Sequence, residues 1–222
     1  MSLKAGQRPP PTGRGPMGGS PVVVVVEGPN DVEFLRRISR IVHAHDPRAP
    51  DLNVKEQQGK VIFLPLGGGG VAAWADRLAP LKLCEFHLFD RETPPETDVR
   101  QAIVKQVNRR VGCRASLTRK RSMENYLHPE ALARAGELEV PFGDFDPVPD
   151  LVARAAYERD QPAIAWDCLT RRAHKRFINR VKRWLNTKVV DQMTCQLLCE
   201  RDADGEIMSW LDTIAYLAGG AR

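Results

Sequence analysis

Apolar runs alternate with helical patterns through the first half of the chain. Residues 22–26 are five consecutive valines, and this uninterrupted run predicts a fully buried parallel strand. Residues 61–66, 85–89 and 114–118 predict three more strands. Apolar residues at helical spacing follow the first three strands, over residues 34–42, 71–83 and 98–110. Repeated strand–helix units imply right-handed crossovers, so we expect an α/β fold with a parallel four-stranded sheet flanked by helices.

The second half of the chain has no strand pattern beyond Pro129. Residues 136–150 predict a loop rich in Pro and Gly, and residues 151–160, 166–186, 190–200 and 205–218 predict helices. Residues 1–20 are rich in Pro, Gly and Arg and predict a disordered tail. We therefore expect a tail (1–20), an α/β catalytic domain (21–128) and a basic helical appendage (129–222).

Composition narrows the class of protein. A chain of 222 residues with 42% hydrophobic residues suits one globular domain with an appendage. The five cysteines are scattered and odd in number, which favours buried reduced thiols over a zinc site or disulfides. No apolar stretch approaches the roughly 20 residues that span a bilayer, and no signal peptide opens the chain. We expect a cytoplasmic protein without a membrane partner.

Positive charge is concentrated in two runs, although the net charge is only +5. One run precedes Glu124, and the other has no acidic residue between Asp167 and Asp191. Clustered Lys and Arg are typical of polyanion binding, and a solvated helix face is the alternative. The candidate nucleic-acid-binding residues are Arg121, Arg171, Arg172, Lys175, Arg176, Lys182 and Arg183.

Acidic residues follow two of the predicted strands and one basic run. They are Glu27 and Asp31, Asp90 and Glu92, and Glu124. The carboxyl ends of parallel strands meet at one edge, where ligands bind. Carboxylates gathered there repel one another unless a hard cation with oxygen ligands lies between them.

Each acidic group also has a simpler interpretation that the residues alone leave open. Asp31 suits a helix N-terminus, with Glu27 incidental. Asp90 and Glu92, which an extended segment would point to one side, also suit a surface turn. Glu124 follows Lys120 by four residues, as in a helical surface pair. Residues 67–70 are four glycines without the Lys and Ser/Thr of a P-loop, so we expect a turn and no ATPase motor.

The order of these motifs resembles a known family. Glu27-Gly28-Pro29-Asn30-Asp31, Leu64-Pro65-Leu66-Gly67-Gly68, Asp90-x-Glu92 and Arg121-Ser122-Met123-Glu124-Asn125-Tyr126-Leu127 are similar to the TOPRIM domain of the overcoming-lysogenization-defect (OLD) nucleases. The resemblance covers about residues 21–128. It implies a compact four-stranded parallel sheet, bound Mg²⁺ or Mn²⁺, and phosphodiester chemistry.

Roles for individual residues follow from this resemblance alone. It implies that Glu27 is a general base or metal-proximal carboxylate, that Asp31, Asp90 and Glu92 hold metal, and that Glu124 completes a second metal site. Lys120 would steady the phosphate. The family's usual DxD is Asp90-x-Glu92 here, and the ATPase domain that precedes this TOPRIM in OLD proteins is missing. Activity would then depend on a separate ATPase subunit, or the protein acts alone.

The sequence thus predicts a metal-dependent nuclease with Glu27, Asp90 and Lys120 as its catalytic residues and with DNA ahead of RNA as substrate. The serious alternative is a non-catalytic nucleic-acid-binding or regulatory subunit of a separate ATPase. A topoisomerase or a primase would need more chain than remains here. A homodimer is one option for the assembly.

Overall fold

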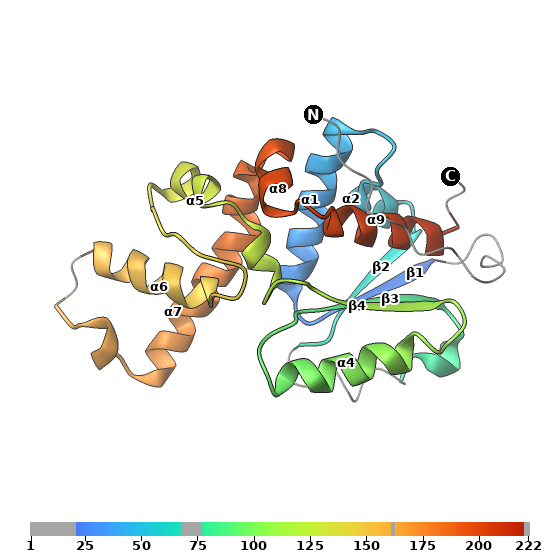
Figure 1. Ribbon diagram of the computed structural model, residues 1–222, viewed down its shortest axis with the longest axis horizontal. Coiled ribbons are helices and arrows are strands. Elements are labelled where there is room, and N and C mark those ends of the chain that lie inside the picture. The colour runs from blue at the N-terminus through green and yellow to red at the C-terminus, as the bar shows by residue number, and fades with distance from the viewer. Residues whose placement is uncertain (1–20, 68–76, 161–162, 220–222) are drawn as a thin grey trace.

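A parallel sheet forms the centre of the protein. The computed structural model describes residues 21–67, 77–160 and 163–219 (Figure 1). Four strands lie in the order β2-β1-β3-β4, with every pairing parallel. Their bounds are Val22–Val26 (β1), Val61–Pro65 (β2), Cys84–Phe89 (β3) and Cys113–Leu117 (β4). The predicted α/β class and the four-stranded parallel sheet are confirmed.

Helices cover both faces of this sheet. Figure 1 shows α4 (Glu96–Val107) on one side, and α1 (Pro29–His45), α2 (Leu52–Gln57) and α9 (Glu206–Leu217) on the other. The residues of β1 are all buried, as expected for a central strand between two layers. The apolar stripe of α9 is buried in the main hydrophobic core, together with alternate residues of β1. The C-terminal helix therefore packs directly against the sheet.

The remaining helices lie to one side of the sheet (Figure 1). They are α5 (Pro129–Gly136), α6 (Val148–Arg159), α7 (Arg171–Trp184) and α8 (Cys195–Arg201). A π-helical turn, η4 (Leu185–Val189), continues α7 without a break. Short 3₁₀ turns cover Ala79–Leu81 (η1), Met123–Tyr126 (η2), Trp166–Cys168 (η3) and Val190–Gln192 (η5). One hydrophobic core includes residues of β1, α1, α5, η4 and α9, so the sheet and the C-terminal helices share their interior.

Several predicted element boundaries differ from the structure. The sequence predicts no helix where α5 lies, and the helix predicted over residues 166–186 is a 3₁₀ turn, α7 and the start of η4. The helix predicted over 190–200 becomes η5 and α8, which are separated at Met193 and Thr194. The predicted tail, the glycines at 68–70 and residues 71–76 of the helix predicted over 71–83 lie outside the described residues. The described remainder, 77–83, contains only the 3₁₀ turn η1, so the predicted helix is wrong there. Helical segments of similar composition do not signal where a 3₁₀ or π turn interrupts them.

Two smaller expectations can be compared with the structure. All five cysteines are free thiols, as predicted, but of the five only Cys113 is buried and Cys168 is exposed, so the predicted burial is wrong for most of them. In the described ranges, no helix has both the length and the apolar character needed to cross a membrane.

Candidate metal and phosphate site

Two carboxylates meet where adjacent strands end. Glu27 directly follows β1, and Asp90 directly follows the neighbouring β3. The Asp90 backbone N–H donates to Glu27 Oε1 at 2.9 Å. Arg100 of α4 also pairs with Glu27, with Nη2 3.0 Å from Oε2. Burial raises the pKa of Glu27, and the positive charge of Arg100 opposes that rise.

Asp31 enters the same region from the first turn of α1. Its Oδ2 accepts the backbone N–H of Gly28 at 2.8 Å, which fixes the side chain at the helix N-terminus. Burial raises the pKa of Asp31 to about 7, even though the positive charge of Lys182 lowers it. The negative charges of Glu124 and Glu27 add to the rise. The residue is therefore both the N3 acid of a capping box, with Gly28 as N-cap, and a member of a carboxylate cluster.

Asp90 is a deeply buried acid of this cluster. It is 3% exposed, and its Oδ1 accepts the backbone N–H of Met123 at 3.0 Å. Burial raises its pKa well above the ordinary value, and the charges of Asp31, Glu124 and Glu27 raise it further. Three segments far apart in sequence therefore bring their acids within electrostatic reach of one another.

Glu124 is supplied by the 3₁₀ turn η2 and is fully buried. Its Oε1 accepts Asn186 Nδ2 at 2.7 Å and lies 3.6 Å from Lys182 Nζ. Its Oε2 is buried without a hydrogen-bond partner. Since Glu124 lies inside η2 and Lys120 outside it, the predicted alternative of a Lys120–Glu124 surface pair on one helix is wrong.

Lys182 reaches this cluster from the last turn of α7. The charge of Glu124 is the largest cause of the raised pKa of Lys182, and burial opposes this rise. The charges of Asp90, Asp31 and Glu27 raise the pKa of Lys182 further. Four carboxylates thus face two cations, Lys182 and Arg100, which leaves two negative charges in excess when all are ionised. Buried charge of one sign is costly unless protons or a bound cation neutralise it.

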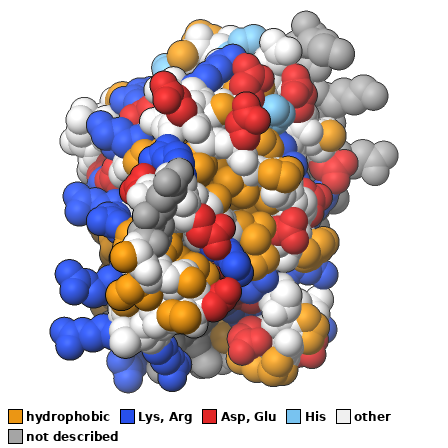
Figure 2. Space-filling view, turned by 90° about the vertical axis from the view of Figure 1, so that its left-hand side faces the viewer, with side chains coloured by type: hydrophobic (Ala, Val, Ile, Leu, Met, Phe, Trp, Pro, Cys, Tyr) orange, Lys and Arg blue, Asp and Glu red, His pale blue; other side chains and the backbone are white. Residues whose placement is uncertain are grey.

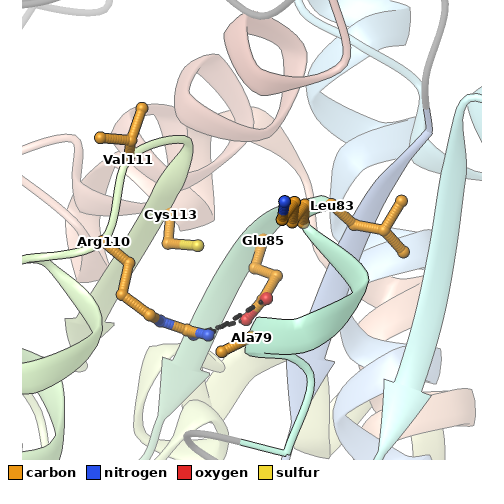
Figure 3. A pocket seen from close by; sticks show the side chains of 7 residues that line it. Ala79, Leu83, Glu85, Arg110, Val111 and Cys113 are labelled. Carbon is orange, nitrogen blue, oxygen red and sulfur yellow. Dashed lines mark hydrogen bonds and ion pairs between the residues drawn. The ribbon is translucent and has the colours of Figure 1, made fainter.

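A buried acid elsewhere in the sheet gives a useful contrast. Glu85 near the start of β3 accepts Arg110 Nη2 at 2.6 Å and contacts His87 Nε2 at 2.7 Å. Burial alone would raise its pKa, but these bonds lower it overall. Figure 3 shows Glu85 and Arg110 beside a cavity of about 430 Å³ at the amino end of β3 and β4. Here the protein supplies its own neutralising partners, whereas in the cluster at the carboxyl ends the acids outnumber the cations.

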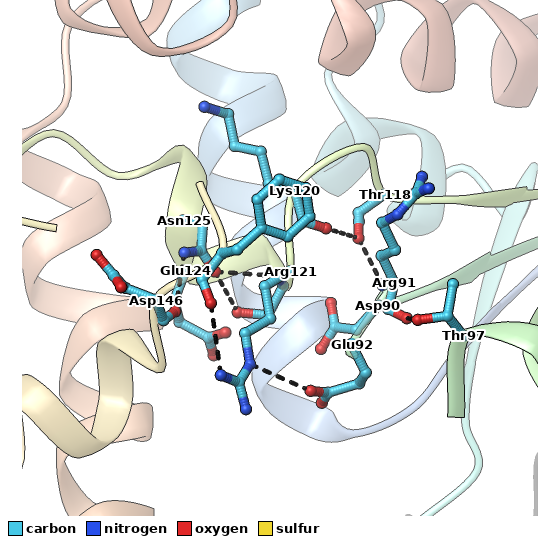
Figure 4. Close-up of polar contacts among 12 residues, drawn as sticks. Asp90, Arg91, Glu92, Thr97, Thr118, Lys120, Arg121, Glu124, Asn125 and Asp146 are labelled. Atoms are coloured by element: carbon cyan, nitrogen blue, oxygen red, sulfur yellow. Dashed lines mark hydrogen bonds and ion pairs between the residues drawn. The ribbon is translucent and has the colours of Figure 1, made fainter. Parts of the chain in front are cut away.

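Lys120 does not face the carboxylate cluster, contrary to prediction. Its ammonium group pairs with Asp144 and lies 5.4 Å from the centre of the Tyr126 ring. Figure 4 shows its side chain pointing away from Asp90 and Glu92. Lys182, which the sequence assigns to nucleic-acid binding, occupies the position expected of Lys120.

Glu92 lies at the rim of the cluster. Its φ of 54° is left-handed, so the predicted extended segment from Asp90 to Glu92 is wrong. Its side chain is 33% exposed and pairs with Arg121 Nε at 3.4 Å (Figure 4). Arg121 also donates to the backbone oxygen of Phe145, at 3.5 Å. Glu92 still acts on Glu27 electrostatically, whereas Arg121 already has an acidic partner.

The outer face of α7 carries cations without acidic partners. Figure 2, which faces the side of the molecule where α6 and α7 lie, shows Lys and Arg side chains gathered along one margin. Within the part of the chain that the structure describes, these exposed α7 residues have no ion-pair partner: Arg171, Arg172, Lys175, Arg176 and Arg183. Lys175 precedes Lys182 by two helical turns, or roughly 10 Å, on the same side of the helix. A basic surface therefore leads along α7 towards the carboxylate cluster.

Two residues of the site were missed by the sequence analysis. Arg100 lies in the helix after β3, and nothing in its spacing marks it as the partner of Glu27. Asn186 had a signal, because it is a polar residue between the buried apolar positions Leu185 and Val189. A buried amide in an apolar segment usually has a specific hydrogen-bonding partner.

The side chains of the cluster suit a hard divalent cation by their chemistry. They offer carboxylate oxygens, one of which is the unpartnered buried Oε2 of Glu124. When all are ionised, their negative charges outnumber the positive charges of Lys182 and Arg100. Among the described residues, however, no group of three His, Cys, Asp or Glu side chains is already arranged to hold a metal. One reason is that Glu27 has both of its oxygens in contact with Arg100. A cation would therefore draw the acids out of their present contacts.

Comparisons with known proteins give one distant likeness. No protein-family model matches the chain, and no curated protein matches it at a significant level. Three structures of the C-terminal region of the Xanthomonas campestris pv. campestris OLD protein, phased with iodine, platinum and mercury, share 13%, 14% and 16% sequence identity with it. The matches cover 88% of this chain and 96%, 94% and 97% of those chains, with TM-scores of 0.44, 0.44 and 0.43. At this identity and TM-score no residue role is carried over.

Proposed function

We propose that this protein is a metal-dependent nuclease that hydrolyses phosphodiester bonds of nucleic acid. The observation that supports it best is the buried cluster of Glu27, Asp31, Asp90 and Glu124, with Lys182 reaching into it from a basic helix. An excess of buried carboxylates suits cation binding, and a basic surface suits a polyanion. The two features meet at Lys182, at the end of α7.

Each part of the site has a distinct proposed task. Asp31, Asp90 and Glu124 would hold Mg²⁺ or Mn²⁺, with Glu92 at the rim. The bound ion supplies Lewis-acid polarisation of a phosphoryl oxygen and activates water. The exposed cations of α7 bind the sugar-phosphate backbone without regard to base sequence, because they contact charge alone. Lys182 is placed to stabilise negative charge that develops on the phosphate.

Glu27 is the proposed proton acceptor. Its burial raises its pKa, which brings a carboxylate closer to the range where it accepts a proton from attacking water. Arg100 and the Asp90 backbone N–H hold its two oxygens in a fixed orientation. In this scheme Lys182 takes the role predicted for Lys120, because Lys182 acts on all four acids of the cluster whereas Lys120 pairs with Asp144.

A nicking assay tests the proposal. Supercoiled plasmid DNA and a single-stranded RNA are each incubated with purified protein in Mg²⁺, Mn²⁺ or EDTA. We expect cleavage that needs a divalent cation and that Asp90→Asn abolishes. Asp98→Asn is the matched control, because Asp98 is an exposed acid in the first turn of α4. Cleavage that persists in EDTA would refute the dependence on metal, and equal cleavage by wild type and Asp90→Asn would refute the proposed site. The preference for DNA over RNA as substrate stays a prediction, which the same assay tests.

A non-catalytic nucleic-acid-binding or regulatory subunit is the second candidate. The observation that favours it is that no ready-made metal-holding group exists in the described part of the chain. It predicts nucleic-acid binding that EDTA leaves unchanged and no strand cleavage. Co-purification with a tagged copy from the native host, followed by assay for ATP hydrolysis, would test the proposed separate ATPase subunit.

A further inference from the structure

Two buried oxygens at the edge of the carboxylate cluster have no hydrogen-bond partner. They are Oε2 of Glu124 and Oδ1 of Asn186, and both residues are fully buried. The groups that carry them are in direct contact, since Asn186 Nδ2 donates to Glu124 Oε1 at 2.7 Å. Unpartnered buried acceptors are rare in natural proteins, and a pair in adjoining groups suggests a shared partner.

The orientation of the Asn186 amide is fixed by its surroundings. Its Nδ2 donates to Glu124 Oε1 and also to the backbone oxygen of Lys182, at 2.8 Å. Both partners are acceptors, so exchanging the amide nitrogen and oxygen would place oxygen against oxygen twice. The carbonyl oxygen Oδ1 is therefore the atom left unpaired.

The π-helical turn η4 explains how Asn186 comes to face Glu124. Asn186 is the second residue of η4, one turn after Lys182, and both contact the same oxygen of Glu124. π-helical turns inside α-helices occur frequently at functional sites, because they change the direction of side chains locally. In this chain the turn places an amide, rather than an apolar residue, beside a buried acid.

The missing partner of these two oxygens must be a donor or a cation. The neighbourhood already has excess negative charge, since Asp90 and Asp31 act electrostatically on the same region. An amide carbonyl oxygen and a carboxylate oxygen are both ligands for Mg²⁺, Mn²⁺ and Ca²⁺. A water molecule would satisfy both acceptors, but only a cation would also neutralise the acids, which outnumber Lys182 and Arg100 by two when all are ionised.

We propose that Asn186 is a cation ligand, and that its Oδ1 and Glu124 Oε2 form one side of a divalent-cation position at the edge of the carboxylate cluster. This deepens the proposed function and rests on it only in that the cluster binds a divalent cation. Asn186 would also fix Glu124 through its N–H group, so one residue orients the acid and supplies a ligand.

Binding of Mn²⁺ alone to the full chain tests the proposal without any activity measurement. The loss of the EPR signal of free Mn²⁺ measures this binding. Asn186→Ala removes the ligand oxygen and the donor together, and we expect about tenfold or greater weakening of Mn²⁺ binding at one position. Asn179→Ala is the matched control, because Asn179 is an exposed amide on the same helix and should leave binding unchanged. Asn186→Asp keeps an oxygen but loses the donors and adds a charge beside Glu124. We expect it to bind Mn²⁺ at least as tightly as wild type and to melt at lower temperature in EDTA.

Each outcome decides the assignment. If Asn186→Ala binds Mn²⁺ as tightly as wild type, the assignment is overturned. It is also overturned if Asn186→Asp loses as much Mn²⁺ affinity as Asn186→Ala, because then only the N–H donors of the amide matter. Folding of each variant is checked by circular dichroism in EDTA; if Asn186→Ala does not fold, the comparison of Asn186→Asp with wild type decides. Failure of the nuclease proposal gives different results from failure of the Asn186 ligand proposal. Asn186-dependent Mn²⁺ binding without cleavage supports the ligand and refutes hydrolysis, whereas Mg²⁺-dependent cleavage with unchanged binding by Asn186→Ala refutes the ligand alone.

Discussion

Replacing Lys182 with methionine should destabilise the metal-free protein much more than the metal-loaded one. Lys182 Nζ lies 3.6 Å from Glu124 Oε1, and its side chain is 32% exposed. A unit charge pair at that separation is worth roughly 4–5 kcal/mol at an effective dielectric constant of about 20. Solvent screening of the partly exposed ammonium group reduces this to about 2–3 kcal/mol. Methionine keeps most of the stem, so the loss is mainly of charge.

Thermal unfolding in EDTA at pH 8 measures the effect. For a chain of this size the expected loss corresponds to a melting temperature about 5–10 °C lower. Saturating Mg²⁺ should shrink the difference, because the bound ion supplies the missing positive charge. Low pH should shrink it too, because Asp31, with its pKa raised to about 7, is then protonated.

Lys175→Met is the matched control for this prediction. Lys175 lies two turns earlier on α7, is exposed, and has no ion-pair partner in the described ranges. We expect a change in stability within about 0.5 kcal/mol. Equal small changes for both variants, independent of Mg²⁺ and pH, would show that Lys182 is an ordinary surface lysine and would refute the reasoning.

Three further predictions concern the cluster and the basic helix. Asp90→Asn should abolish cleavage yet raise the melting temperature in EDTA at pH 8. The substitution removes a buried acid that neighbouring acids repel, and the new amide oxygen still accepts the Met123 N–H. A lower melting temperature would contradict this. The folded-state pKa of Asp31 is raised to about 7, so the contribution of Asp31 to stability in EDTA is fully present below about pH 4 and should be lost as the pH rises through 7. A pH series of unfolding curves in EDTA measures it, and a contribution that grows over this range would contradict the prediction. Nucleic-acid binding should weaken steeply with salt, and Arg171→Gln or Arg176→Gln should lower the logarithmic salt slope by about 1 each, which fluorescence anisotropy measures; an unchanged slope would exclude α7 from the binding surface.

The strands were the easiest part of the fold to predict. Five consecutive valines, with no alternation, leave little choice but a central parallel strand, and β1 has those bounds. The strand ends then placed Glu27 and Asp90 at one edge of the sheet, because parallel strands share their direction. The backbone N–H of Asp90 does bond to Glu27. Local sequence was sufficient because the strand pattern and the site lie within adjoining residues.

Contacts between distant segments were not predictable in the same way. Lys120 and Lys182 both lie in basic runs, and which of them reaches the acids depends on how α7 packs against η2. The left-handed backbone at Glu92 separates that acid from Asp90, and no glycine marks the turn in the sequence. Asn186 depends on a π-helical turn, which has no sequence signature of its own. Each depends on tertiary packing rather than on local pattern.

A crystal structure of the full chain with Mn²⁺, recorded at a wavelength where manganese scatters anomalously, tests the central claim most directly. We predict an anomalous peak among Asp31, Asp90 and Glu124, with carboxylate oxygens roughly 2.0–2.6 Å from the ion. Saturating Mn²⁺ with no peak there would contradict it.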